Sequence, residues 1–194
     1  MRAYLIGLLV AAAVLGCAPA DSGWHVKNIS GLMPDLSFTM TDDQGRVVGG
    51  QGYRGEVPLL FFGYSHCPDE CPATLARLAQ AVAMMKAGAA DVRVLFVTVD
   101  PQRDTESRLH SYLESFGPEF VGLRGTPNQL AALAKRYRVT YSLGEPDAGG
   151  DYEVTHSDAV FVFDRTGRAR LLIRPDDQVS AITADLERLS TGQR

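Results

Sequence analysis

The segment VPLLFFGYSHCPDECP, residues 57–72, is the stretch of sequence that decides the fold. Its first half, residues 57–64, is a continuous apolar run interrupted only by Pro58 and Gly63. An apolar run without polar alternation predicts a central strand that is covered on both of its faces. Cys67 and Cys71 follow where this strand gives way to a helix. The segment therefore predicts an α/β fold with two cysteines just beyond a buried strand.

The sequence on either side of this segment alternates between strand and helix patterns. Before it, the turn signal Asp42-Asp43-Gln44-Gly45 separates two short strand-like stretches and predicts an N-terminal β-hairpin. After it, the expected elements are a helix over residues 75–85, a strand over 92–99, a helix behind Asp104 as its N-cap, a short strand over 120–123, a helix behind Thr126-Pro127, a loop over 144–150, a hairpin of strands 159–163 and 169–173, and a helix over 179–189. This order predicts a three-layer α/β sandwich with a mixed central sheet, and a thioredoxin-like fold fits it.

Length and composition limit the chain to one well-buried domain. It has 194 residues, of which 45% are hydrophobic and 22% are charged. That amount of apolar material suits a single core better than two. The formal net charge of -4 provides no basic field that would gather phosphate groups, so we expect no nucleic-acid partner.

The N-terminus has the pattern of an export signal. Met1 and Arg2 precede an uncharged apolar run over residues 3–15, which is shorter than the roughly 20 residues that a spanning helix needs. The following Gly16-Cys17 resembles the lipobox of bacterial lipoproteins. We therefore expect a signal peptide with a lipobox over residues 1–17, a lipidated Cys17, a tether over residues 18–30 and the domain over residues 31–194. An ordinary signal peptide or an uncleaved anchor, with Cys17 incidental, is the alternative.

These expectations place the domain outside the cytoplasm, as a membrane-anchored lipoprotein of the bacterial cell envelope that faces the periplasm or the cell exterior. In that compartment disulfides are permitted, and only Cys67 and Cys71 remain once Cys17 is set aside. Four residues apart at a helix start, the two sulfurs share one face, and the helix dipole favours thiolate over thiol. The pair can therefore bind a soft metal, form a redox-active disulfide, or form a purely structural disulfide that closes its loop.

A metal held by two thiolates needs a further ligand, and three histidines are worth weighing. His66 adjoins Cys67, but neighbouring side chains often diverge, and His110 lies in a polar helical setting typical of a surface residue. His156 immediately precedes a predicted buried strand, so it lies at a sheet end where loops assemble sites. Spacing alone leaves His66 and His156 open. Met84 and Met85 fit the pattern of a packed or surface helix better than that of extra metal ligands.

Several segments of the chain resemble the Sco/SenC family. Residues 61–72 are similar to its cysteine signature, residues 99–105 to its Asp-Pro-x-Arg-Asp-Thr segment, residues 122–127 to its Gly-Leu-x-Gly-Thr block, and residues 154–157 to its histidine loop. The resemblance covers residues 36–189 and implies a thioredoxin-like fold with copper bound by Cys67, Cys71 and His156. It also implies that Asp100 is an acid near the copper site, although Asp100 would equally serve to cap a turn. Ser65 and Thr155 depart from the family pattern, which more often has Thr and Asp there.

The chemistry of the implied ligands agrees with the resemblance. Two thiolates and one imidazole form a soft, three-coordinate set that suits Cu(I) and can also hold Cu(II), whereas zinc would normally take a fourth ligand. The family implies delivery of copper to the binuclear copper centre of cytochrome c oxidase, with the copper-centre subunit and another periplasmic copper chaperone as partners. The alternative is a thiol-disulfide oxidoreductase in which Cys67 and Cys71 reduce the acceptor cysteines of that subunit. A peroxide-reducing enzyme fits less well, because two cysteines so close together need no distant resolving partner.

Overall fold

A computed structural model of the chain describes residues 23–149 and 151–192. The expected signal peptide, its lipobox and Cys17 lie outside the described residues. Over the two described ranges, no helix combines the length and the apolar character that crossing a bilayer would require.

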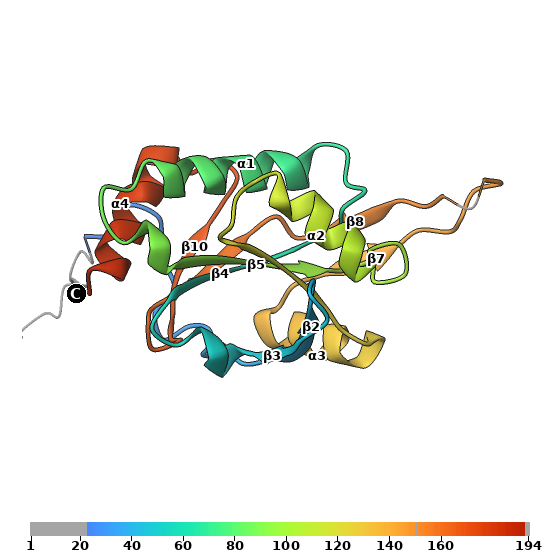
Figure 1. The fold of residues 1–194 in the computed structure, drawn as a ribbon, viewed down its shortest axis with the longest axis horizontal. Coiled ribbons are helices and arrows are strands. Elements are labelled where there is room, and N and C mark those ends of the chain that lie inside the picture. The colour runs from blue at the N-terminus through green and yellow to red at the C-terminus, as the bar shows by residue number, and fades with distance from the viewer. Residues whose placement is uncertain (1–22, 150, 193–194) are drawn as a thin grey trace, which may run out of the picture.

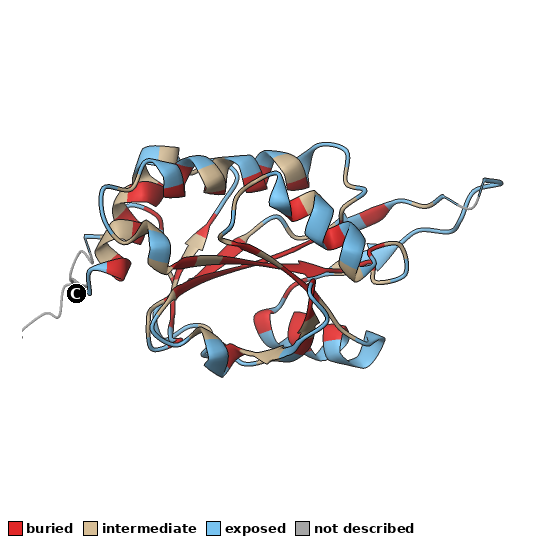
Figure 2. Ribbon diagram, viewed as in Figure 1, coloured by how far each residue is buried: buried red, intermediate tan, exposed pale blue. Residues whose placement is uncertain are grey.

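An eight-stranded mixed sheet forms the centre of the fold, in the order β1-β10-β9-β4-β5-β6-β2-β3. The strands β4, β5 and β6 run parallel to one another, and the remaining pairs are antiparallel. The bounds are β1 Lys27–Asn28, β2 Thr39–Asp42, β3 Val47–Gly49, β4 Val57–Gly63, β5 Val92–Thr98, β6 Phe120–Arg124, β9 Val160–Phe163 and β10 Ala169–Ile173. Every residue of β4 is buried, which confirms a central strand covered on both faces (Figure 2).

Within residues 23–149 and 151–192, four α-helices lie on the two faces of this sheet and complete three layers (Figure 1). The helices α1 (Glu70–Ala83), α2 (Glu106–Glu114) and α4 (Val179–Ser190) cover one face, and α3 (Pro127–Tyr137) lies on the other. Each helix buries its apolar stripe against the sheet, as its periodic pattern requires. The three-layer α/β sandwich and the N-terminal hairpin, β2 with β3, are therefore confirmed.

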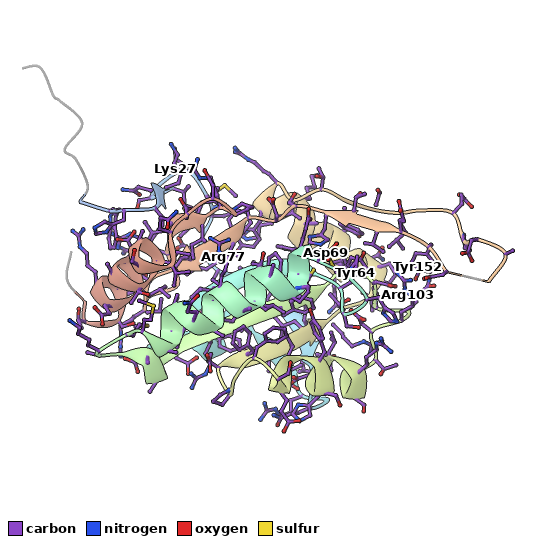
Figure 3. All side chains as sticks on the ribbon, turned by 90° about the horizontal axis from the view of Figure 1, so that it is seen from above. Lys27, Tyr64, Asp69, Arg77, Arg103 and Tyr152 are labelled. Atoms are coloured by element: carbon purple, nitrogen blue, oxygen red, sulfur yellow. The ribbon has the colours of Figure 1, made fainter. Side chains whose placement is uncertain are left out.

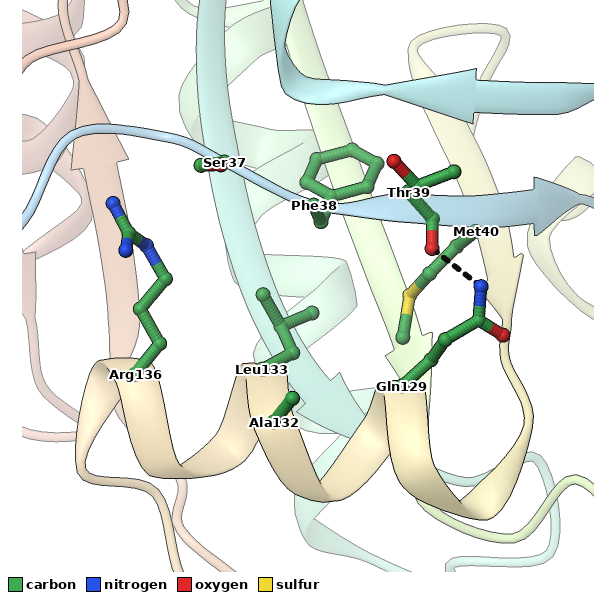
Figure 4. Close-up of a pocket in the computed structure, with 8 residues that line it drawn as sticks. All are labelled: Ser37, Phe38, Thr39, Met40, Gln129, Ala132, Leu133 and Arg136. Atoms are coloured by element: carbon green, nitrogen blue, oxygen red, sulfur yellow. Dashed lines mark hydrogen bonds between the residues drawn. The ribbon is translucent and has the colours of Figure 1, made fainter.

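The helix α3 is fixed at its start by a capping box. The Thr126 hydroxyl accepts from the Gln129 backbone N–H, and the Gln129 side chain accepts from the Thr126 backbone N–H. The same Gln129 amide donates to the Thr39 carbonyl at 2.9 Å, which ties α3 to the beginning of β2 (Figure 4). An open pocket remains between the two elements, and Leu133 and Met40 are among the residues that line it.

The expected tether ends earlier than residue 30. Lys27–Asn28 forms β1, the edge strand of the sheet, which pairs with β10, and both Val26 and Ile29 are buried. The buried carboxylate of Asp185 accepts hydrogen bonds from the backbone N–H groups of His25 and Val26. The last part of the expected tether is therefore an edge of the domain. The sequence did not predict this because two apolar residues on either side of a two-residue strand leave no periodic pattern.

One further local expectation is corrected, and another is extended by two strands that the sequence did not reveal. The N-cap of α2 is Thr105, whose hydroxyl accepts from the Arg108 backbone N–H, and not Asp104. The expected loop is present over its described residues, 144–149, and it is flanked by two unexpected strands, β7 (Tyr141–Leu143) and β8 (Val154–His156), that pair only with each other. This β7–β8 hairpin extends away from the body of the molecule (Figure 1).

Candidate metal centre

The two cysteines lie at the junction of β4 and α1. Cys67 is part of the loop that follows β4, and Cys71 is the second residue of α1. The first turn of a helix leaves its backbone N–H groups without helical partners, and the N–H of Cys71 donates to the sulfur of Cys67 at 3.3 Å. Pro72 suits this first turn because its missing N–H costs nothing there. The strand-to-helix junction thereby brings both sulfurs to one point.

His156, the last residue of β8, completes the group from a distant part of the chain. Its Nε2 lies 3.3 Å from the Cys71 sulfur, and its Nδ1 lies 3.0 Å from the Ser157 carbonyl oxygen. Because a carbonyl only accepts, Nδ1 carries the ring proton and Nε2 presents its lone pair toward the cysteines. The rings of Phe61 and Tyr64 pack edge-on against the imidazole and fix its plane.

The three donor atoms of Cys67, Cys71 and His156 all lie within 4.8 Å of one another. Among the described residues, no other group of three or more His, Cys, Asp or Glu side chains comes together in this way. Cys67 and His156 line an open pocket between the cysteine loop and β8, so a metal ion can enter and leave. Two sulfurs and one imidazole nitrogen, converging from two sides, suit the soft metal copper.

The charge state of the Cys71 thiol differs from the expectation that the helix start makes it acidic. Cys71 is entirely buried, and burial raises the pKa of its thiol well above the usual value. Desolvation penalises the thiolate more than the helix N-terminus favours it. Cys71 is therefore a neutral thiol in the metal-free, reduced protein, and a bound metal must displace its proton.

The other residues considered as ligands lie outside this group. The His66 ring faces the buried carboxylate of Asp104, 3.7 Å away, and His110 lies 3.5 Å from Asp43 near the surface. Met84 is exposed, and Met85 packs against the hydrophobic core. The structure thus brings His156, and neither His66 nor His110, to the two cysteines.

Asp100 lies behind the site and is not one of the grouped donors. It is fully buried and accepts hydrogen bonds from the Arg103 guanidinium and, at 2.7 Å, from the Tyr152 hydroxyl. Burial by itself would raise the pKa of Asp100, but the hydrogen bonds from Arg103 and Tyr152 hold that pKa below its usual value. Asp100 also caps its turn, since it accepts from the backbone N–H of Arg103 at 3.4 Å.

Asp104 positions the cysteine loop, a role that the sequence reasoning missed. Its buried carboxylate accepts from the Ser65 N–H at 3.0 Å, from the Ser65 hydroxyl at 2.5 Å and from the Thr98 hydroxyl at 2.6 Å. These bonds connect the end of β5 with the residue two positions before Cys67. The only sequence signal was an acid ahead of a helical pattern, which predicts an N-cap equally well.

Gly63 provides the space that the Cys71 sulfur occupies. A Cβ at this position would lie 2.7 Å from that sulfur and 2.7 Å from the Phe96 ring. We expect Gly63→Ala to displace Cys71, to destabilise the protein by about 1–3 kcal/mol through overpacking, and to weaken metal binding. Denaturant unfolding and a metal titration measure the two effects.

Gly52→Ala is the matched control, because nothing lies within 4 Å of a Cβ added at Gly52. It should change neither property. Equal behaviour of Gly63→Ala and Gly52→Ala would show that the close packing around Cys71 does not govern the site.

The chain resembles known proteins both in sequence and in structure. A model of the SCO1/SenC family matches residues 32–191. The SCO2 homolog of Bos taurus, a mitochondrial protein, is 42% identical over 132 residues, which are 67% of this chain and 50% of that protein. This chain thus spans about half the length of the curated relatives that it matches.

Solved structures of copper-bound relatives have the same fold. The structure of Bradyrhizobium japonicum ScoI with copper bound has a TM-score of 0.73 and 35% sequence identity, and the match covers 80% of this chain and 99% of that one. Yeast Sco1 with copper bound has a TM-score of 0.76 and 26% identity, over 84% and 91% of the two chains.

Proposed function

Since this chain belongs to the SCO1/SenC family, we propose that it is a copper chaperone that carries copper to the binuclear copper centre of cytochrome c oxidase. The convergence of Cys67, Cys71 and His156 within 4.8 Å is the observation that carries this proposal. Copper is the cargo of such a protein, so the site must bind the metal firmly and also release it.

The donor set suits both requirements. Cu(I) is soft and accepts two thiolates readily, and the imidazole supplies the nitrogen donor that Cu(II) favours more strongly. The pocket beside Cys67 and His156 is open, so an incoming ligand of an acceptor protein can approach the metal and exchange for one of the three donors. His156 is the donor best suited to leave first, because it comes from a separate hairpin.

Copper binding also depends on the redox state of the cysteines. Both Cys67 and Cys71 are free thiols in the structure, and a disulfide would leave no thiolate to hold the metal. We therefore expect only the dithiol form to load with Cu(I). The same pair, with Cys67 partly exposed, also supports the second candidate, a thiol-disulfide oxidoreductase acting on the acceptor cysteines.

The site of action in this proposal is extracytoplasmic, with the chain held on the bacterial membrane through lipidated Cys17. The short apolar N-terminal run and the Gly16-Cys17 sequence support it. Metabolic labelling with radioactive fatty acid tests the anchor. Label lost from the Cys17→Ser variant supports it, and equal label in the variant and the parent contradicts it.

An anaerobic transfer experiment tests the proposed function itself. The full chain, loaded with Cu(I), is mixed with the reduced copper-binding domain of an oxidase subunit, and copper is measured on each protein after separation. The proposal predicts transfer that depends on Cys67, Cys71 and His156. If the parent holds no copper but reduces an oxidised acceptor, and the His156→Ala variant reduces that acceptor equally well, the result would instead support the oxidoreductase.

A further inference from the structure

Arg103 lies where three segments of the site meet. Its Nε donates to the buried carboxylate of Asp100, and its Nη1 donates to Asp151 at 2.5 Å. The centre of its guanidinium lies 3.8 Å from the centroid of the Tyr152 ring and 5.8 Å from that of Tyr64. Figure 3 shows Tyr64, Arg103 and Tyr152 together beyond the start of α1. Arg103 thus contacts the β5–α2 loop, the cysteine loop and the β7–β8 hairpin at once.

Tyr152 contacts both Arg103 and Asp100. Its hydroxyl donates to Oδ1 of Asp100 at 2.7 Å, while its ring covers the guanidinium of Arg103. The three side chains form a closed arrangement: Arg103 to Asp100, Asp100 to Tyr152, and Tyr152 back to Arg103. We call these three residues the latch. A buried carboxylate is costly unless it is paired, so separating Asp100 from Arg103 and Tyr152 is unfavourable.

The β7–β8 hairpin has few other attachments. Its strands pair only with each other, and Leu143 and Thr155 are exposed. Over the described part of residues 141–156, side-chain hydrogen bonds to other parts of the fold join Asp151 to Arg103, Tyr152 to Asp100, and His156 to Cys71. The hairpin that ends in His156 is therefore held over the cysteines chiefly by the latch and by the packing of its base.

We propose that Arg103 is a positioning residue whose latch holds the β7–β8 hairpin closed and so fixes His156 as the third copper ligand. This inference rests on the proposed function. With the latch closed, the metal has two sulfurs and one nitrogen. With the latch open, His156 moves away and leaves Cu(I) on the two thiolates alone, ready for ligand exchange. Arg103 and Tyr152 of the latch line an open pocket beside the metal pocket, so an approaching partner can reach these two side chains directly.

The chemistry of the latch requires arginine rather than any cation. A planar guanidinium can donate to Asp100 and Asp151 at fixed angles and stack on Tyr152 at the same time, whereas a lysine ammonium has neither the fork nor the flat face. Arg103→Lys therefore keeps the charge and loses the geometry. Tyr152→Phe keeps the stacking ring and loses only the hydrogen bond to Asp100. Both variants leave every copper ligand in place.

The test compares Arg103→Lys and Tyr152→Phe with the parent, using the full chain. Arg165→Lys is the control, because Arg165 makes an analogous ion pair with Asp91 at the far end of the sheet. Hydrogen exchange of the hairpin amides is measured first, without metal. Loss of Cu(II) to a chelator is then followed through the thiolate-to-copper absorption, and Cu(I) stoichiometry is measured by competition.

We expect faster exchange of the hairpin amides in both latch variants and roughly 10- to 100-fold faster loss of Cu(II), the range typical for residues that orient a metal ligand. Cu(I) stoichiometry should stay as in the parent. In the His156→Ala background, Arg103→Lys should add no further effect on copper, because the latch acts through His156. Arg165→Lys should behave as the parent does.

Parent-like amide exchange and Cu(II) loss in both latch variants would overturn the inference. An effect of Arg103→Lys on copper that persists undiminished without His156 would overturn it as well, since Arg103 would then act on the metal by another route. A parent that binds no copper at all would overturn the proposed function together with the latch, whereas failure of the latch alone leaves copper binding by the parent intact.

Discussion

Cys71→Ser is expected to remove high-affinity copper binding while leaving the fold intact. Serine has nearly the volume of cysteine, so the space between Gly63 and Phe96 stays filled. Its hydroxyl is a poor ligand for a soft metal, and the remaining thiolate of Cys67 and the imidazole of His156 do not make a comparable site. The loss of Cu(I) affinity should exceed the roughly 100-fold that removal of an outer hydrogen-bond partner costs a metal site.

Anaerobic competition against a chromophoric Cu(I) chelator measures this affinity, and thermal unfolding checks the fold. Thr74→Ser is a matched control, because Thr74 lies further along α1 and the change removes one methyl group but no ligand. Cu(I) affinity of Cys71→Ser within tenfold of that of the parent would show that the buried sulfur is not a ligand.

His156→Ala is expected to separate the two oxidation states of copper. The variant keeps both thiolates, so Cu(I) should still bind, with weaker affinity and faster exchange. Cu(II) needs the nitrogen donor more, so its binding and its thiolate-to-copper colour should nearly vanish. The imidazole contacts Phe61 and Tyr64 at the edge of the core, so the loss of stability should be modest.

Absorption and electron paramagnetic resonance spectra of Cu(II)-loaded protein measure this difference. His110→Ala is the control, because the His110 ring lies beside Asp43 and away from the cysteines. If His156→Ala binds both copper states as the parent does, His156 is not a ligand and His66 becomes the leading candidate.

The central strand and the cysteine site were predictable because their signals are local. The continuous apolar run before Cys67 predicts a strand that is covered on both faces, and β4 is buried along its whole length. A helix that starts next to Cys71 then follows from the spacing of apolar residues. Selecting His156 over His66 required the family resemblance, since spacing had left both open, and the distance of 3.3 Å from the Cys71 sulfur supports that selection.

The features that the sequence did not reveal depend on contacts between distant segments. The strand β1 has two residues, and its place at the sheet edge depends on Asp185, about 160 residues away. Asp104 binds Ser65 across 39 positions, and nothing in its neighbourhood distinguishes that role from a helix cap. The raised pKa of Cys71 likewise reflects complete burial, which outweighs the helix dipole. Local sequence patterns do not predict contacts between residues so far apart in the chain.

X-ray absorption at the copper edge tests most directly whether Cys67, Cys71 and His156 hold copper together. The full chain is loaded with one equivalent of Cu(I) under reducing conditions, in the parent and in His156→Ala. We predict two sulfur neighbours and one nitrogen neighbour of copper in the parent, and loss of the nitrogen alone in the variant. Fewer than two sulfur neighbours in the parent, or identical spectra for the two proteins, would contradict the three-ligand site.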